Sequence, residues 1–290
     1  MTLFIWAVIL IASLAVLIKA SDLFLDGAER TGHYFHLPLF TTGLIIVAVG
    51  TSLPELASSI LAVLHDAGEI VAGNVVGSNI ANMLLVLGTG GLFFRGSDAK
   101  PHRLGKDTAP LLISAGLLYL LLGTKTIPSW TGVVLLLLAV LYVLTLGRRG
   151  ISPLVEPHTS ATVLKAQDVV KLFFAPICIY LSAEYTIIAV ISLAEKTALS
   201  QEIMALSAIA LGTSLPEAAV SYSAARRGNM SLIFGNIVGS TIFNSLVVVG
   251  GARLFGPLAV GAAVQGGTRH VFLGALCIFI LYTRKKILPK

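Results

Sequence analysis

The chain has 290 residues, of which 56% are hydrophobic and only 12% charged, with a mean hydropathy of +0.91 and a net charge of +6. A soluble domain has about 25% charged residues, so this composition excludes a water-soluble enzyme, a disordered protein and a nucleic-acid binder. A membrane span with its connecting loop takes around 30 residues. The length therefore predicts an all-α polytopic membrane protein with at most about ten spans.

Apolar runs, taken in chain order, predict nine membrane-spanning helices. They cover residues 3–24, 38–64, 69–93, 109–123, 130–147, 172–194, 199–225, 229–254 and 270–283. With the N-terminus placed outside, the inner connections hold 15 Lys and Arg residues and the outer connections hold four. Positive charge collects on the cytoplasmic side of membrane proteins, so the sequence predicts that the N-terminus faces out.

A repeat at an offset of 162 residues relates the two halves of the chain. Residues 48–88 and 210–250 align without a gap and agree at 20 of 41 positions, where chance would give roughly two to four. Five spans separate corresponding points, so the second copy crosses the membrane in the opposite direction. Inverted repeats with Gly/Pro-interrupted helices are typical of secondary transporters with a mid-membrane site. We therefore expect a first repeat over 1–147, a cytoplasmic linker over 148–171 and a second repeat over 172–290.

Each copy of the repeat contains the sequence GTSLPE, which places Glu55 and Glu217 deep within apolar segments. An acid at that depth indicates a functional site unless a basic residue pairs with it. The interiors of predicted spans two, three, seven and eight contain no Lys or Arg. The charge must then be met by a bound cation or by protons.

The neighbouring polar residues favour a hard cation. Thr51 and Ser52 lie four and three residues before Glu55, so their oxygens share one helical face, and the second copy repeats this arrangement. Pro54 and Pro216 each free a backbone carbonyl. In the next span of each repeat, Asn and Ser residues recur every four positions: Asn74, Ser78, Asn82 and Asn236, Ser240, Asn244. Clustered oxygen ligands suit Ca²⁺, and the same oxygens could hold Na⁺.

These residues resemble the sodium/calcium exchangers of the calcium/cation antiporter superfamily, through the paired GTSLPE and G-N-x-V-G-S-x-I-x-N motifs. The resemblance implies Ca²⁺ extrusion coupled to Na⁺ entry by alternating access. Spans two, three, seven and eight would form the ion-binding core, and spans one and six would slide across it. The implied ion ligands are Glu55, Glu217, Thr51, Thr213, Ser52, Ser214, Ser78 and Ser240, with the carbonyls of Ala48 and Ala210, while Asn82 and Asn244 would line the pocket.

The chain departs from the family pattern at a few points. Asn244 replaces an Asp that the K⁺-dependent branch carries, which argues against K⁺ co-transport and leaves the pocket at −2. Thr241 replaces the more usual Asn beside Ser240. The family has ten spans, and a tenth would begin just after Pro289, so both a nine-span protein and a truncated form fit. There is no large insert between spans five and six, which points to a prokaryotic plasma-membrane protein.

Other interpretations remain open at this stage. A Ca²⁺/H⁺ antiporter could use the same two glutamates, releasing Ca²⁺ by taking up two protons. A passive channel fits a closed two-carboxylate cluster less well, and an intramembrane enzyme lacks a base near Ser52 or Ser214. Asp22, Asp26 and Glu184 suit either a structural role or an ion vestibule. The expected ligands are Ca²⁺ and Na⁺, with no cofactor, nucleic acid or protein partner implied beyond the lipid bilayer.

Overall fold

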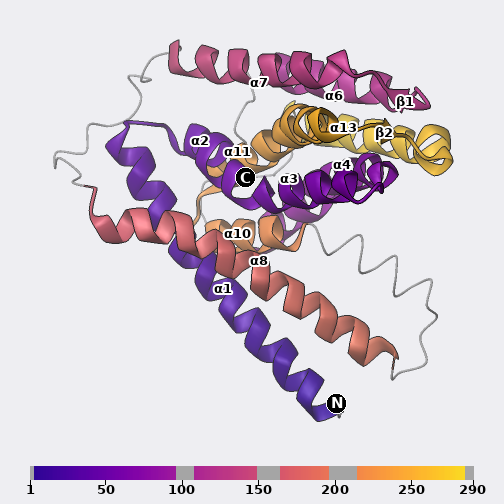
Figure 1. The fold of residues 1–290 in the computed structure, drawn as a ribbon. Helices are drawn as coiled ribbons and strands as arrows, with labels where there is room; N and C mark the ends of the chain where they lie inside the picture. The colour runs from indigo at the N-terminus through magenta and orange to yellow at the C-terminus, as the bar shows by residue number, and fades with distance from the viewer. Residues whose placement is uncertain (1–2, 96–107, 149–163, 196–213, 285–290) are drawn as a thin grey trace.

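The computed structural model describes residues 3–95, 108–148, 164–195 and 214–284. These residues form an almost entirely helical fold (Figure 1), with α1 (Leu3–Tyr34) and α8 (Ala166–Glu195) as its longest helices. The repeated motif of the first half lies in α2 (Leu39–Thr42), η1 (Gly43–Val47), α3 (Ala48–Leu64), α4 (Gly68–Ala81), η2 (Asn82–Val86) and α5 (Leu87–Phe93), where η marks a π-helical turn. The repeated motif of the second half lies in α10 (Leu215–Arg226), α11 (Met230–Phe243), η4 (Asn244–Val248) and α12 (Val249–Phe255).

The other described elements are α6 (Thr108–Leu121), α7 (Trp130–Arg148), η5 (Val264–Thr268) and α13 (Arg269–Arg284). Phe272 and Phe279 of α13 are fully buried, and this helix packs on α4 and η2. A short antiparallel pair joins the loops between these helices, β1 (Thr126–Ile127) with β2 (Leu258–Ala259). Figure 1 shows α6 and α7 stacked on one side of the repeats, with α1 and α8 on the opposite side.

Helix lengths agree with most of the predicted spans but do not fix their number. Five continuous helical segments are long and apolar enough to cross a membrane, namely Leu3–Tyr34, Leu39–Leu64, Gly68–Phe93, Ala166–Leu193 and Met230–Phe255. Three further apolar helices are shorter, at Ala109–Leu121, Trp130–Leu146 and Arg269–Ile280. Predicted span 199–225 lies outside the described residues up to position 213.

The two long helices extend further than their apolar runs predicted. α1 continues ten residues beyond the predicted end at 24 because its acidic residues find partners on other helices, as described below. α8 starts six residues before the predicted span and inside the predicted linker 148–171. There the Asp168 carboxylate accepts a hydrogen bond from the Lys165 N–H at 3.2 Å. An acid in the first turn stabilises the start of a helix. A search for apolar runs does not detect such a charged residue, so the predicted span began too late.

The repeat seen in the sequence is also a repeat of backbone geometry. The π-helical turns η2 and η4 begin at Asn82 and Asn244, which are 162 residues apart. The turns after α3 and α10 each contain a residue with positive φ, Asp66 at 60° and Gly228 at 74°, again at the same offset. The two copies therefore share their irregular backbone as well as their residues.

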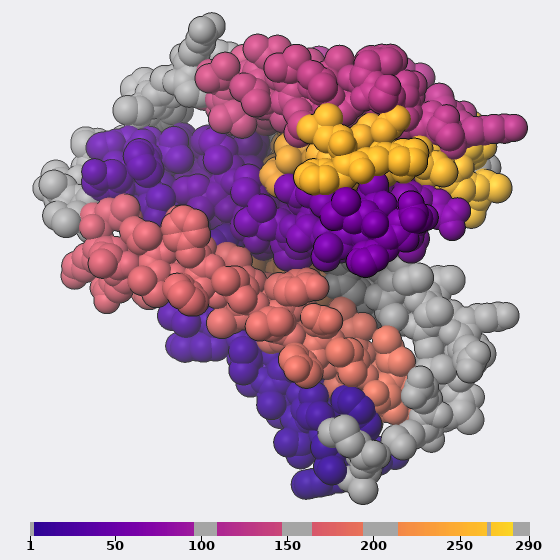
Figure 2. All heavy atoms as spheres, viewed as in Figure 1, coloured from indigo at the N-terminus to yellow at the C-terminus, as the bar shows by residue number. Residues whose placement is uncertain are grey.

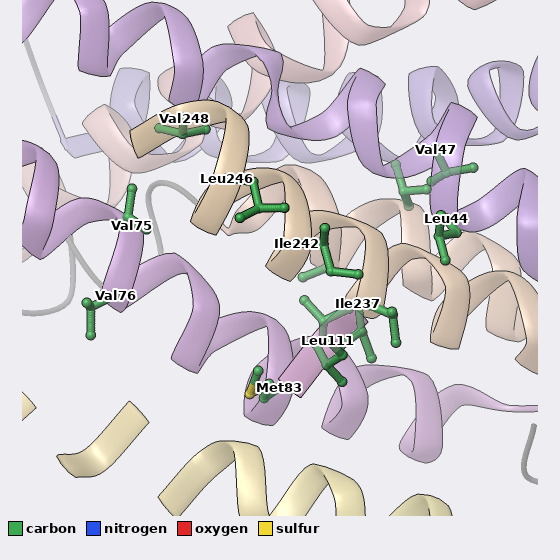
Figure 3. Packing of buried hydrophobic residues seen from close by; sticks show 14 of the residues in the cluster. Leu44, Val47, Val75, Val76, Met83, Leu111, Ile237, Ile242, Leu246 and Val248 are labelled. Carbon is green, nitrogen blue, oxygen red and sulfur yellow. The ribbon is translucent and has the colours of Figure 1, made fainter. Parts of the chain in front are cut away.

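The hydrophobic core lies around α11, the most deeply buried of the long segments. Figure 3 shows Ile237, Ile242 and Leu246 of this segment packed among apolar side chains from η1, α4 and α6. Glycines bring the backbones into direct contact. A β-carbon on Gly239 would lie 2.2 Å from the Leu44 carbonyl oxygen, and one on Gly235 would lie 2.1 Å from that of Phe40. Small residues allow such close approach of membrane helices, so α11 is fixed against η1 and α2.

By contrast, α1 and α8 pack mainly on each other. They lie side by side along much of their length and project beyond the other helices (Figure 1 and Figure 2). Phe24 of α1 fills the space above Gly50 of α3, where a β-carbon would lie 2.4 Å from the ring. The outer faces of the pair expose large apolar side chains, including Ile11, Val16, Phe173 and Phe174. Such faces suit contact with lipid.

Candidate functional site

Two glutamates, one from each repeat, meet in the interior. Glu55 lies within α3 directly after Pro54, and its side chain is 3% exposed. Glu217 lies in the first turn of α10 directly after Pro216 and is 1% exposed. The two carboxylates are close enough to interact electrostatically. The structure thus brings together the two acids that the repeated motif singles out.

Hydroxyl and amide groups from both repeats surround these carboxylates. Ser52 Oγ donates to Glu217 Oε1 over 3.4 Å. Thr51 Oγ1 lies 3.5 Å from Asn236 Oδ1, and Ser240 Oγ donates to the same oxygen over 3.4 Å. These contacts connect α3, α10 and α11 through side-chain oxygens, which are the ligand type that hard cations prefer.

Several polar atoms in this interior have no partner within the described part of the chain. Both carboxylate oxygens of Glu55 and Oε2 of Glu217 lack a hydrogen bond there. The Ser214 hydroxyl and the side-chain amides of Asn82 and Asn244 are also buried without one. Leaving a buried polar group unsatisfied costs about 1–3 kcal/mol, and more for a charge. The oxygens among them are free to serve as ligands to a bound cation.

The two asparagines occupy equivalent irregular positions. Asn82 opens η2 and Asn244 opens η4, and both side chains are buried. A π-helical turn takes one residue out of the regular hydrogen-bond ladder and is frequent at functional sites. The local backbone therefore supports the expectation that these amides line the pocket.

The remaining predicted ligands fall into two groups. Ala48 and Ser78 are buried on α3 and α4, and the Ala48 carbonyl oxygen lies 3.4 Å from Thr51 Oγ1. Ala210 and Thr213 lie outside the described residues. The structure thus brings together Glu55, Glu217, Thr51, Ser52 and Ser240 by the contacts above, while Ala210 and Thr213 keep only their place in the repeat.

The site is acidic and lacks a basic counterion in the described ranges. There, no Lys or Arg forms an ion pair with Glu55 or Glu217. The acids that do form ion pairs in these ranges are Asp22, Asp26, Glu29 and Asp168. Nor does this part of the chain hold a group of three or more His, Cys, Asp or Glu side chains suited to a metal ion. A site with two carboxylates and otherwise neutral oxygen ligands binds a cation less tightly than a site with more carboxylate ligands. Moderate affinity suits an ion that must also leave.

A cavity of about 210 Å³ reaches this site from the side of α8. It is lined by Pro54, Glu55 and Ser58 of α3, by Tyr180, Ala183, Glu184 and Ile187 of α8, and by Pro216 of α10. This volume has room for several water molecules. Glu55 is therefore buried but borders a space that water can occupy.

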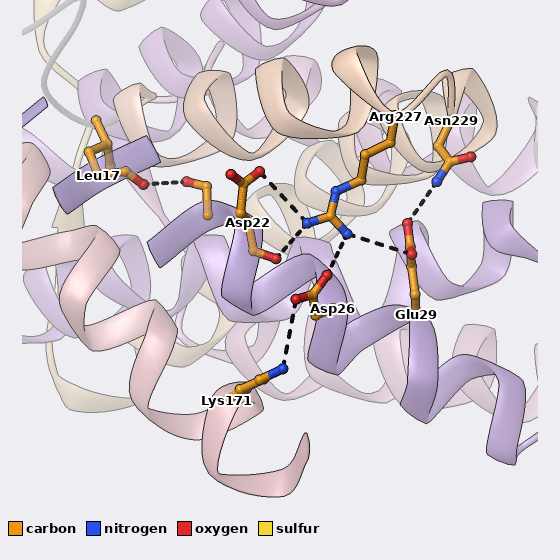
Figure 4. Close-up of polar contacts among 8 residues, drawn as sticks. Leu17, Asp22, Asp26, Glu29, Lys171, Arg227 and Asn229 are labelled. Carbon is orange, nitrogen blue, oxygen red and sulfur yellow. Dashed lines mark hydrogen bonds and ion pairs between the residues drawn. The ribbon is translucent and has the colours of Figure 1, made fainter. Parts of the chain in front are cut away.

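A second cluster of charges ties α1 to the turn between α10 and α11 (Figure 4). Arg227 Nη1 donates to Asp26 Oδ1 over 2.8 Å, and Arg227 Nη2 donates to the Asp22 carbonyl oxygen over 2.7 Å. Asn229 Nδ2 donates to Glu29 Oε1 over 2.7 Å, and Lys171 Nζ of α8 lies 3.7 Å from Asp26 Oδ2. For Asp22 and Asp26 these contacts support the structural role rather than the ion vestibule.

Sequence reasoning did not place every polar residue of the interior. Asn236 was noted in the four-residue stripe but not assigned to the site, yet it contacts Thr51, Ser240 and, over 3.4 Å, Ser221. Its spacing before Ser240 and Asn244 was the available signal. The Asn79 to Ser245 hydrogen bond, at 3.2 Å, joins the two repeats through positions that the offset does not relate. No sequence signal pointed to that pair.

The inverted repeats, the interrupted helices and the paired buried carboxylates define the class as a multi-pass cation antiporter. Comparison with known proteins gives the family. The family described as "Sodium/calcium exchanger protein" matches residues 5–147 and 169–287, and the chain belongs to this family. The resemblance in the repeated motifs is thereby confirmed.

Curated relatives of similar length extend the match over most of the chain. The inner membrane protein YrbG of Escherichia coli is 30% identical, covering 94% of this chain and 87% of its own length. The sodium/calcium exchanger MaX1 of Methanosarcina acetivorans is 29% identical, covering 94% and 90%. A solved structure of the sodium-calcium exchanger NCX_Mj superimposes with a TM-score of 0.77 at 27% identity, covering 96% of this chain and 90% of the other. The fold is thus that of an all-α membrane exchanger.

Proposed function

We propose that this cation antiporter exchanges Ca²⁺ for Na⁺ by alternating access, with its N-terminus outside a plasma membrane. The observation that carries the proposal is the set of buried oxygens without partners around Glu55 and Glu217. Two carboxylates balance the charge of one Ca²⁺, and nearby hydroxyl and amide oxygens can complete a coordination number of six to eight. The same pocket would hold Na⁺ ions when Ca²⁺ is absent.

Each predicted residue has a defined part in this proposal. Glu55 and Glu217 are the central Ca²⁺ ligands. Oxygens for Ca²⁺ or Na⁺ come from Thr51, Ser52, Ser78, Ser214 and Ser240, from the Ala48 carbonyl and, by the repeat, from Thr213 and Ala210. Asn82 and Asn244 line the pocket from the two π-helical turns.

The packing suits alternating access through movement of α1 and α8. The core helices meet backbone to backbone at Gly235 and Gly239, whereas α1 is held to the turn between α10 and α11 by the Arg227 side chain. Shear between packed elements changes side-chain contacts more readily than backbone contacts. The pair would slide across a core that keeps its shape.

Sodium coupling is supported by the relatives. MaX1 and NCX_Mj are both named sodium/calcium exchangers. Proton coupling is the second candidate, because the site chemistry alone also suits two glutamates that release Ca²⁺ by taking up protons. Asn244, in place of an acid, leaves the expected charge of the pocket at −2 and argues against K⁺ co-transport.

The deciding experiment measures ⁴⁵Ca²⁺ uptake into proteoliposomes. Vesicles loaded with Na⁺ and diluted into Na⁺-free buffer should take up ⁴⁵Ca²⁺, while K⁺-loaded vesicles should not, even with an imposed pH gradient. Glu55→Gln protein serves as the matched inactive control, and Glu69→Gln removes an exposed acid from α4 as the active one. Uptake driven by the pH gradient without Na⁺ would establish proton coupling instead and would remove the Na⁺ assignments.

A further inference from the structure

We propose that Glu184 is a cation-docking residue at the entrance of the ion site, so that an entering cation is first held at Glu184 and then passes to Glu55. The proposal rests on the proposed function and adds a residue that the repeated motifs do not contain. It follows from the cavity beside α8, from the charge that faces it and from a contrast with Asp22.

The cavity connects Glu184 to the buried site. Tyr180 and Glu184 are four residues apart on α8 and so share one helical face, and both line the cavity. Glu55 and Ser58 line it from α3, three residues apart. The space of about 210 Å³ accommodates a cation that keeps part of its water shell. The two carboxylates thus line one cavity from α3 and from α8.

The charge in this cavity is uncompensated. Glu184 lies near the middle of the predicted span 172–194, where an acid must pair or face water. None of the residues that line the cavity is Lys, Arg or His. Among the described residues, no ion pair involves Glu184. Two carboxylates facing one low-dielectric cavity attract cations and raise their local concentration.

The buried end of the cavity supplies an independent sign of a ligand. Glu55 is 3% exposed and borders the cavity, and neither of its carboxylate oxygens has a partner within the described residues. A cation that leaves Glu184 therefore meets a carboxylate with both oxygens available. Such a sequence of weak and stronger sites lets an ion enter without becoming trapped.

The residue equivalent to Glu184 in the first half is used differently. Asp22 on α1 stands 162 positions earlier, and its carboxylate lies 3.7 Å from the Arg227 guanidinium. The position of Arg227 is matched in the first repeat by His65, at the same offset. One acid of the pair is neutralised where α1 is held against α10, and the other faces the open cavity. This is the arrangement expected of a conformation that is closed on one side and open on the other.

The test compares Ca²⁺ dependence of exchange in Glu184→Gln with that in wild type. The KM for Ca²⁺ should rise about three- to tenfold at low ionic strength, because one unit charge near the path is lost. The difference should shrink at high salt, where screening is strong, and the maximal rate should change by less than about twofold. Glu184→Asp should restore most of the affinity. Asp66→Asn is the matched control, since it removes an exposed acid outside the cavity and Asn tolerates its positive φ.

A chemical version keeps one folded protein throughout. Glu184→Cys is made in a background where Cys178 and Cys277 are replaced by Ala, and it is treated with anionic or cationic methanethiosulfonate reagents. The anionic adduct should lower the KM for Ca²⁺ and the cationic adduct should raise it. Failure of both reagents to react, or equal effects of both, would overturn the proposal. If wild type exchanges Ca²⁺ for Na⁺ while Glu184→Gln keeps its KM, only this inference is wrong; if wild type shows no exchange, the proposed function itself fails.

Discussion

The two repeats carry the same motif but place their glutamates in different surroundings. Glu55 lies inside α3, which continues through Pro54, and neither of its carboxylate oxygens has a partner in the described residues. Glu217 lies in the first turn of α10, and its Oε1 accepts a hydrogen bond from Ser52. The start of a helix also provides free N–H groups and a favourable dipole for a carboxylate. The same GTSLPE motif thus gives its glutamate different surroundings in the two halves, because Glu55 and Glu217 lie at different places in their helices and have different partners.

The same contrast holds for the acids of α1 and α8. Asp22 lies beside Arg227, while Glu184 borders the cavity. Under the proposed alternating access, the two halves would exchange surroundings when the protein changes conformation, so a difference between them in one conformation is informative. Substitutions at equivalent positions of the two halves measure how far their surroundings differ.

The largest effect is expected for the buried glutamates. Glu55→Gln and Glu217→Gln should each reduce Na⁺-dependent ⁴⁵Ca²⁺ uptake at least about a hundredfold, because a carboxylate ligand to Ca²⁺ is lost. In ion-free detergent solution, Glu55→Gln should raise the Tm more than Glu217→Gln, since it removes the charge without protein partners. Wild-type uptake in either variant would contradict the site, and equal Tm changes would contradict the inequality of the two glutamates.

A large loss of stability is expected where the repeats differ in packing. In Gly239→Ala the new β-carbon would lie 2.2 Å from the Leu44 carbonyl oxygen and 2.6 Å from the Ala48 β-carbon. We expect a loss of about 1–3 kcal/mol from overpacking, seen as a lower Tm. Gly77→Ala is the equivalent change in the first repeat, where no described residue lies within 4 Å of the new atom. A similar Tm for both variants would show that the two glycines are equally constrained.

A moderate effect is expected at the contact between α1 and α10. Arg227→Gln removes the guanidinium that contacts Asp26 over 2.8 Å and the Asp22 carbonyl oxygen over 2.7 Å. Hydrogen bonds to charged groups contribute about 1.5–3 kcal/mol, so backbone hydrogen exchange of α1 around Asp26 should speed up roughly tenfold or more. Arg226→Gln is the control, since Arg226 lies over the Tyr222 ring and not on an acid. Unchanged protection of α1 in Arg227→Gln would show that the cluster does not hold the helix.

The smallest effect is expected from changing the charge of the π-helical turns. Asn244→Asp adds a buried carboxylate at the start of η4 and should lower the Na⁺ concentration needed for half-maximal exchange several-fold. It should also allow K⁺ to affect the rate. Asn82→Asp makes the equivalent change in the first repeat, and comparing the two shows which turn lies nearer the monovalent ions. Identical Na⁺ and K⁺ dependence in Asn244→Asp and wild type would place Asn244 away from those ions.

The sequence predicted the repeat, the helical class and the meeting of Glu55 with Glu217, because these depend on residues that recur at a fixed offset. It did not predict the full lengths of α1 and α8. Hydropathy ends a span where charges begin, but in α1 those charges pair with Arg227, more than 200 positions away in the chain. For Asn236 the four-residue spacing gave a signal, but it did not show the contacts with Thr51 and Ser221, because these partners come from other helices.

The glycine contacts at η1 have a consequence for the mechanics of transport. Gly235 and Gly239 contact the backbone of Phe40 and Leu44, so the helices touch through main-chain atoms. A main-chain contact cannot adapt by a change of side-chain rotamer, and it therefore resists sliding of one helix on the other. Under the proposed mechanism, motion would be confined to α1 and α8, whose exposed outer faces carry Ile11, Val16, Phe173 and Phe174. Lipid would then have to flow around these side chains at every turnover. The viscosity of the bilayer would therefore act as friction on the exchange rate, and a stiffer membrane should slow the protein without altering its affinity for ions.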